Sequence, residues 1–169
     1  MARCRFVQPE TVRLYLADVH RRALMALKAQ PASDPPTPED MARAEARLAQ
    51  AEADGDFVDA KKQLTAGEQR GVFTDLIKTM HAGEAADLDP KRVGTTKILA
   101  YVLGWSFVDA SGKPVPFSEA ALNNLEPSSF AEIAQAIDDH EAAVEQARAE
   151  RKNDQVGAIT SSLISPSAN

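Results

Sequence analysis

Apolar and polar residues alternate near the N-terminus and again about a third of the way along the chain, which is the pattern of short strands. Two extended runs, Cys4–Val7 and Val12–Leu16, are separated by the turn-like sequence Gln-Pro-Glu-Thr. In the second run the apolar residues alternate with Arg13 and Tyr15. A third run, Phe57–Lys61, follows the turn residues Asp-Gly-Asp. The pattern predicts a small sheet of short antiparallel strands at one edge of the domain.

The segment between the second and third runs has a helical pattern. It covers about residues 18–53, is rich in Ala, Arg and Glu, and has four prolines between Pro31 and Pro38. This composition predicts a helix, a proline-rich loop and a second helix. Thr37 is the predicted cap of the second helix, with Pro38 at its first position. The second helix carries one narrow apolar seam, made of Met41, Ala44, Leu48 and Ala51.

We interpret residues 18–53 as an inserted helical hairpin. The seam is only two heptads long, which is too short to identify a coiled coil. Two interpretations stay open. Either the two helices simply pack on each other, which the pattern favours, or they form an arm that binds a partner.

The second half of the chain has clearer helix signals. Thr65-Ala-Gly-Glu68 is a capping box, and the apolar positions after it follow one face, which predicts a helix over 66–81. The next predicted helix, over 90–104, is apolar on nearly every side and should lie in the centre of the core. A turn-rich loop over 109–116 leads to a short helix capped by Ser118.

The last helix is predicted to start at Pro127 with a second capping box, Ser129-Phe-Ala-Glu132, and to end near Asn153. Residues 154–169 are mostly small and polar, so they predict a flexible tail. The expected fold is mainly α with a small β element (α+β): short antiparallel N-terminal strands, the inserted hairpin, and then a bundle of about four helices. We expect one domain over residues 1–153.

Composition supports this fold class and narrows the partners. The chain has 169 residues, with 44% hydrophobic but only 5% aromatic residues, which suits one closely packed helical core. Its formal charge of −6 and its lack of a dense basic run argue against nucleic acid as the primary partner. Cys4 is the only cysteine, and no run resembles a signal peptide or a membrane span. We expect a protein of a reducing cytoplasm, or of a particle assembled there.

No constellation for catalysis or cofactor binding stands out. His20, His81 and His140 fall in three different elements with no nearby Cys or His pair, so we expect no metal site. The sequence lacks a phosphate-binding loop and a dinucleotide fingerprint. The acidic run from Asp138 to Glu141 is better explained as a solvated helix face than as an acid–base pair. We therefore predict no catalytic residues, no cofactor and no enzymatic activity.

Binding to another protein is the remaining class of function. Trp105 suits a binding anchor, but its place after an apolar helix favours a role in closing the core. Ile159, Leu163 and Ile164 have no obvious core to join, so they form either a docking motif or part of an inert tail. The candidate partner-binding residues are Met41, Leu48, Ile159, Leu163 and Ile164.

Residues 54–153 resemble small proteins encoded in the tail modules of long-tailed bacteriophages, of the kind assigned as tail assembly chaperones. The similar segments are Asp-Gly-Asp-Phe-Val-Asp-Ala-Lys-Lys-Gln-Leu-Thr-Ala-Gly-Glu-Gln-Arg at 54–70, Gly-Trp-Ser-Phe at 104–107, Gly-Lys-Pro-Val-Pro-Phe-Ser at 112–118, and Ala-Ile-Asp-Asp-His-Glu at 136–141. The segment 18–53 departs from the family's pattern, in which the first strands lead almost directly to Asp-Gly-Asp.

The resemblance implies a non-enzymatic chaperone in the host cytoplasm. Such a protein binds the tape measure protein, a long helical chain, while tail tube subunits polymerise around it, so the tail tube protein is a possible second partner. Amphipathic helices can shield the apolar stripes of such a chain, and an acidic chaperone would stay soluble. A structural protein of the tail or of the head–tail connector is the alternative that composition equally allows.

Overall fold

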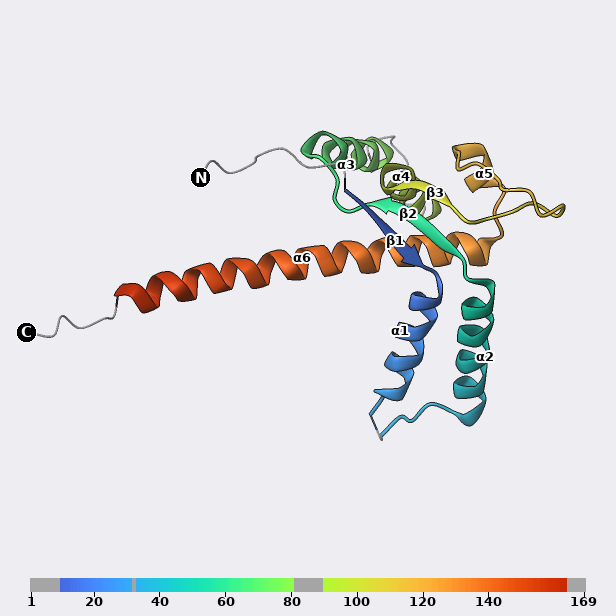
Figure 1. Cartoon of the computed structure of the whole chain (residues 1–169), viewed down its shortest axis with the longest axis horizontal. Helices are drawn as coiled ribbons and strands as arrows, with labels where there is room; N and C mark the ends of the chain where they lie inside the picture. The colour runs from blue at the N-terminus through green and yellow to red at the C-terminus, as the bar shows by residue number, and fades with distance from the viewer. Residues whose placement is uncertain (1–9, 32, 81–89, 164–169) are drawn as a thin grey trace, which may run out of the picture. The chain divides into compact units, whose positions relative to one another are not determined.

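A computed structural model describes residues 10–31, 33–80 and 90–163, with side chains described at 10–31, 33–74 and 94–152. The predicted strand Cys4–Val7 therefore lies outside the described residues. Along the chain the elements are β1 (Thr11–Tyr15), α1 (Ala17–Lys28), α2 (Pro38–Asp54), β2 (Phe57–Lys61), α3 (Ala66–Met80), α4 (Pro90–Tyr101), β3 (Val102–Trp105), α5 (Glu119–Asn123) and α6 (Pro127–Leu163). The fold is mainly α with a small antiparallel sheet, as the sequence predicted (Figure 1).

The chain divides into two compact units, Met1–Ile137 and Asp138–Asn169. The first unit contains the sheet, the helices up to α5 and the start of α6. Within the described residues the second unit is the remainder of α6. This helix continues to Leu163, past Asn153 where the sequence analysis ended it. No proline interrupts the backbone before Pro166, and each further residue adds a hydrogen bond to a helix that already exists.

The sheet has the order β1-β2-β3, and both neighbouring pairs are antiparallel. β1 and β2 are the predicted runs around Val12–Leu16 and Phe57–Lys61, which are thus confirmed as strands. They pair with Arg13 opposite Asp59, and the guanidinium of Arg13 donates to the Asp59 carboxylate at 2.8 and 3.0 Å. The second pair, β2 with β3, has an irregular register between Asp59 and Ala60.

Strand β3 corrects the sequence prediction of a helix over 90–104. The helix α4 ends at Tyr101, and the chain then pairs with β2, with Val102 opposite Ala60 and Trp105 opposite Val58. The apolar residues were correctly identified as core material, but an apolar run does not distinguish a buried helix from a strand. The β-branched Val102 favours extended backbone once a strand edge is available.

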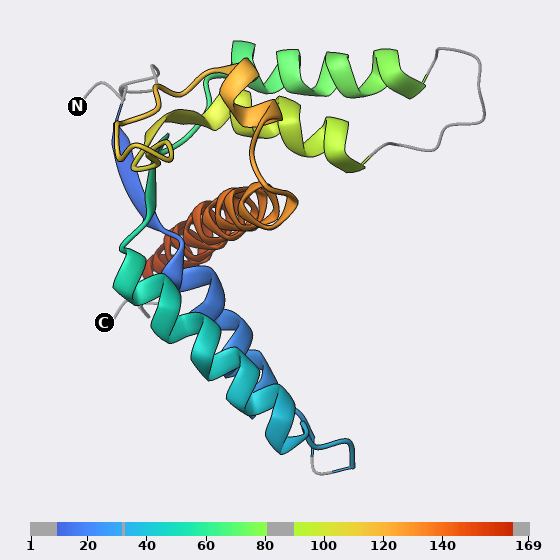
Figure 2. The ribbon, with the colours of Figure 1, turned by 90° about the vertical axis from the view of Figure 1, so that its right-hand side faces the viewer.

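The core lies on one face of the sheet. Val58 and Ala60 of β2 are fully buried there, and they meet side chains from α4, α5 and the start of α6. Figure 2 shows these helices on the same side of the strands. The fully buried large residues are Ile98, Leu122, Ile133, Ile137 and Val58. The opposite face carries Tyr15 and Leu103, whose residues are 49% and 50% exposed.

The segment 18–53 forms the predicted helical hairpin. α1 and α2 pack side by side (Figure 1), and Arg21 of α1 forms an ion pair with Glu52 of α2 at 2.7 Å. The Oγ1 of Thr37 accepts a hydrogen bond from the backbone N–H of Asp40 at 3.1 Å, which confirms the predicted cap. Gly55, with φ of 67°, ends α2 in the left-handed conformation that glycine adopts without steric cost.

Two of the three caps predicted in the second half of the chain are present. Thr65 and Glu68 form the reciprocal capping box, with the Thr65 N–H donating to Glu68 at 2.8 Å and the Glu68 N–H donating to Thr65 at 3.3 Å. Ser118 caps α5 through a bond from Ala121 N–H at 3.1 Å. The predicted box at Ser129 is wrong, because α6 already begins at Pro127 and Ser129 lies inside its first turn.

We expect Thr65→Ala to lower the free energy of unfolding by about 1 kcal/mol, because it leaves a donor of the first turn of α3 without its side-chain partner. Ser129→Ala is the matched control and should change stability by less than about 0.5 kcal/mol, since that serine is not a cap. Urea denaturation of both variants tests this. Equal losses would show that the helix starts are misassigned.

Glu68 should make stability depend on pH in the acid range. The ammonium of Lys61, followed by the N–H and hydroxyl of Thr65, lowers the pKa of Glu68 from 4.5 to about 2. Because the folded pKa lies below the unfolded one, the stabilisation is present above about pH 4.5 and is lost as the pH falls towards 2. Glu68→Gln should therefore show a smaller loss of stability than the parent between these pH values. Parallel acid denaturation curves would contradict this assignment.

Candidate functional site

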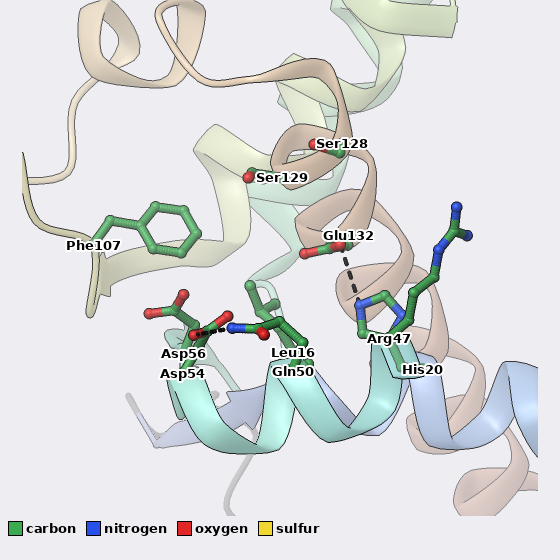
Figure 3. Close-up of a pocket in the computed structure, with 11 residues that line it drawn as sticks. Leu16, His20, Arg47, Gln50, Asp54, Asp56, Phe107, Ser128, Ser129 and Glu132 are labelled. Atoms are coloured by element: carbon green, nitrogen blue, oxygen red, sulfur yellow. Dashed lines mark hydrogen bonds and ion pairs between the residues drawn. The ribbon is translucent and has the colours of Figure 1, made fainter. Parts of the chain in front are cut away.

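A pocket of about 450 Å³ opens where the helical hairpin meets the sheet and the start of α6. Figure 3 shows its lining side chains. They come from the junction of β1 and α1, from α1 and α2, from the turn before β2, from the segment after β3 and from the first turns of α6. The lining residues are Leu16, His20, Arg47, Gln50, Ala51, Asp54, Asp56, Phe107, Ser128, Ser129 and Glu132.

A hydrogen bond between His20 and Glu132 crosses one side of the pocket. The His20 Nε2 and the Glu132 Oε1 lie 3.2 Å apart, and the two side chains are 16% and 30% exposed. The residues are 112 positions apart in the chain, so only folding brings them together. The contact links α1 of the hairpin to α6.

The other side of the pocket is formed by the two aspartates that flank Gly55. Asp54 is the last residue of α2 and accepts a hydrogen bond from Gln50 at 2.8 Å. Asp56 accepts from the hydroxyl of Ser106 at 2.7 Å, and its backbone carbonyl accepts from the N–H of Leu16 at 2.9 Å. Both carboxylates are therefore held in place by side chains of the surrounding elements.

Phe107 extends the same side of the pocket. Its carbonyl accepts from the N–H of Val115 at 2.9 Å, and its ring lies 5.1 Å from that of Trp105. Trp105 packs edge-on against Phe117 at 5.0 Å and donates its indole N–H to the Val115 carbonyl at 2.7 Å. Trp105 is partly buried against the core, in line with the interpretation that it closes the core.

The loop after Phe107 is organised by Asp109, whose carboxylate accepts from the hydroxyl and N–H of Ser111 and from the N–H of Lys113. The hydrogen bond from the Ser111 hydroxyl is the main cause that lowers the pKa of Asp109. These bonds close the turn between Phe107 and Val115, and the Val115 N–H donates to the Phe107 carbonyl.

Among the polar residues that line the pocket, His20 bonds to the carboxylate of Glu132. Across the described ranges, no group of three or more His, Cys, Asp and Glu residues is placed to hold a metal ion. Within the same ranges no helix is both long and apolar enough to span a membrane.

Of the residues predicted from sequence to bind a partner, only Met41 and Leu48 have described side chains. Met41 and Leu48 are half-buried on α2. Ile159 and Leu163 belong to the backbone of α6 in the second unit, beyond the described side chains, and Ile164 lies outside the described residues. Neither Met41 nor Leu48 lines the pocket.

Sequence reasoning missed the pocket because its walls come from distant segments. The sequence identified Asp54-Gly55-Asp56 as a turn. It did not show that Ser106 and Phe107, some 50 residues later, would lie beside this turn and form the pocket wall with it. The sequence offered one weak signal for this pocket. The last turn of α2 has no basic residue and ends in Asp54.

No protein-family model matches the chain, and neither a curated protein nor a solved structure is similar to it. The likeness to phage tail proteins thus rests on the quoted segments alone.

We expect His20 and Glu132 to be energetically coupled. In a double-mutant cycle with His20→Ala and Glu132→Ala, the coupling should be about 0.5–1.5 kcal/mol at neutral pH, the range of a partly buried hydrogen bond. Urea denaturation of the four proteins gives the value. Additive effects of the two substitutions would mean that the hairpin is not held to α6 through this contact.

Proposed function

We propose that this protein is a non-enzymatic tail assembly chaperone that binds the tape measure protein of a long-tailed bacteriophage in the host cytoplasm. The observation that carries the proposal is the resemblance over residues 54–153.

The segments that carry the resemblance are joined to one another in the fold, which supports treating them as one unit. Ser106, from the Gly-Trp-Ser-Phe segment, bonds to both Asp56 and Phe57 of the first segment. Trp105 bonds to Val115 of the third segment. Ala136 and Ile137 of the fourth segment are buried in the same core that holds Val58.

The exposed apolar side chains are compatible with binding to an apolar helix. Tyr15 and Leu103 lie on the face of the sheet opposite the core, and Phe73 on α3 is 64% exposed. Single exposed apolar residues are ordinary on protein surfaces, but an aromatic residue at this exposure suits a contact with another protein. The net charge of −6 would keep such a protein soluble before its partner is bound.

The half-buried state of Met41 and Leu48 changes which residues we expect to make the contact. Met41 and Leu48 are half-buried, so they are less available than Phe73, Tyr15 and Leu103, which are exposed. The last turns of α6, with Ile159 and Leu163, stay candidates on the basis of sequence.

Co-expression with fragments of the cognate tape measure protein should raise the soluble yield of those fragments. The paired variant Tyr15→Ser with Leu103→Ser, and separately Phe73→Ser, should reduce that yield, whereas the polar control Glu119→Gln should not. Soluble and insoluble fractions are compared on gels, with circular dichroism to verify that each variant is folded.

Two results would overturn the proposal. One is that no fragment is solubilised or retained by the protein. The other is recovery of the protein in a fixed copy number from finished virions, which would assign it a structural role in the tail or the connector.

A further inference from the structure

One long side of the helical hairpin is closed by ion pairs, and the other side is hollow. On the closed side Arg21 of α1 pairs with Glu52 of α2 at 2.7 Å, and Lys28 of α1 pairs with Glu45 of α2 at 3.7 Å. On the other side a second cavity, of about 240 Å³, lies between the two helices. It shares two lining residues with the pocket of about 450 Å³, so the two cavities form one groove along the hairpin.

This hairpin groove is lined by small apolar residues and by one charged face of α2. Ala23, Leu27 and Ala44 line the shorter cavity, and α2 has no buried residue. The distance between packed helices depends on the side chains at their contact, so alanines let a third helix approach closely. The charged face of α2, which we call the rim, consists of Arg43, Arg47 and Asp54.

The rim is basic at one end and acidic at the other. Arg43 and Arg47 are one helical turn apart, and Asp54 follows two turns later. Arg43 pairs with Glu39 of its own helix at 2.7 Å, and these side chains are 57% and 81% exposed. Arg47 forms no ion pair within the part of the chain that the structure describes. The charges of the rim are therefore not matched by residues across the groove.

The segment 138–152 of α6 carries the opposite order of charges. Glu141 and Glu145 lie four positions apart, and Lys152 lies eleven positions after Glu141. The two arginines and the aspartate of the rim have the same spacings of four and eleven positions. Val144 is the only large apolar residue of this segment, and four others are alanines. Such a slender helix suits a groove with a small apolar lining.

We propose that the α6 segment of a second copy of this chain lies in the hairpin groove, parallel to α2. The parallel direction forms three ion pairs between the copies: Arg43 with Glu141, Arg47 with Glu145, and Asp54 with Lys152. The antiparallel direction would place like charges together at both ends, so the charges select the parallel one.

The matched region has a definite end. One turn before the first pair, the same register would bring Asp40 near Asp138, so the favourable contact covers residues 141–152 only. Within its own helix Glu145 pairs with Arg148 at 2.5 Å, and these side chains are 64% and 42% exposed. Exposed pairs of this kind contribute little to stability, so they are readily exchanged for pairs between copies.

Each copy offers one groove and one helical segment. Two copies that exchange their segments fill both grooves and close the assembly as a dimer. This inference goes beyond the proposed function and does not depend on it. A chain that dimerises but solubilises no tape measure fragment would support the dimer and contradict the chaperone role.

Sedimentation equilibrium of the full-length chain over a wide range of concentration tests the proposal. We expect a dimer whose dissociation constant rises about tenfold from low to high salt, because exposed ion pairs are screened. The groove variant Arg43→Glu with Arg47→Glu, and the helix variant Glu141→Arg with Glu145→Arg, should each weaken association about tenfold. Circular dichroism verifies that each variant is folded.

The matched control is Lys62→Glu with Lys113→Glu. It makes the same change of net charge as the groove variant, but at exposed residues that do not line the groove. Its dissociation constant should stay within about twofold of the parent, since distant exposed charges are screened.

Mixing the groove variant with the helix variant gives the most specific test. Each reversed surface then meets its reversed complement, and the two unchanged surfaces also meet, so the mixture should form dimers with nearly the affinity of the parent. A monomer at every concentration, or a mixture that associates no better than the separate variants, would overturn the proposal. Association weakened by the helix variant but not by the groove variant would also overturn it, because the α6 segments would then bind a different surface.

Discussion

The burial of one face of strand β2 is the interaction on which the rest of the structure depends. Val58 and Ala60 are fully buried, and β2 is the middle strand, so its backbone is paired on both sides. The side chains packed against this face come from three helices and include Ile98, Leu122 and Ile133. Removing apolar surface from water is the dominant favourable term in folding, and here it is concentrated on a five-residue strand.

The register of that strand also builds the pocket. β2 begins at Phe57, directly after Asp56, and its first residue exchanges backbone and side-chain bonds with Ser106. A slip of one residue would turn Val58 and Ala60 out of the core, so the register is strongly specified. The aspartates and Phe107 are positioned by the same constraint, because they lie at the ends of the paired strands.

The charges of this acidic protein are distributed unevenly. On the sheet surface and in the hairpin, carboxylates are offset by arginine and lysine, as in the pairs Arg13 with Asp59 and Arg21 with Glu52. The guanidinium of Arg13 also lies 3.6 Å from the centre of the Phe57 ring. Asp54 and Asp56 at the pocket accept hydrogen bonds from the neutral groups of Gln50 and Ser106 instead.

The sequence by itself determined the local elements of this protein, because their signals are short-range. The caps at Thr37, Thr65 and Ser118, the strands around Leu14 and Val58, and the helical hairpin all follow from residues close in sequence. Tertiary structure decided what depends on distant partners. The run after Tyr101 became a strand because β2 offered an edge, and Glu132 of α6 meets His20 of α1 only in the folded chain. The pocket was likewise invisible in the sequence, since its walls converge only when the core face of β2 is buried.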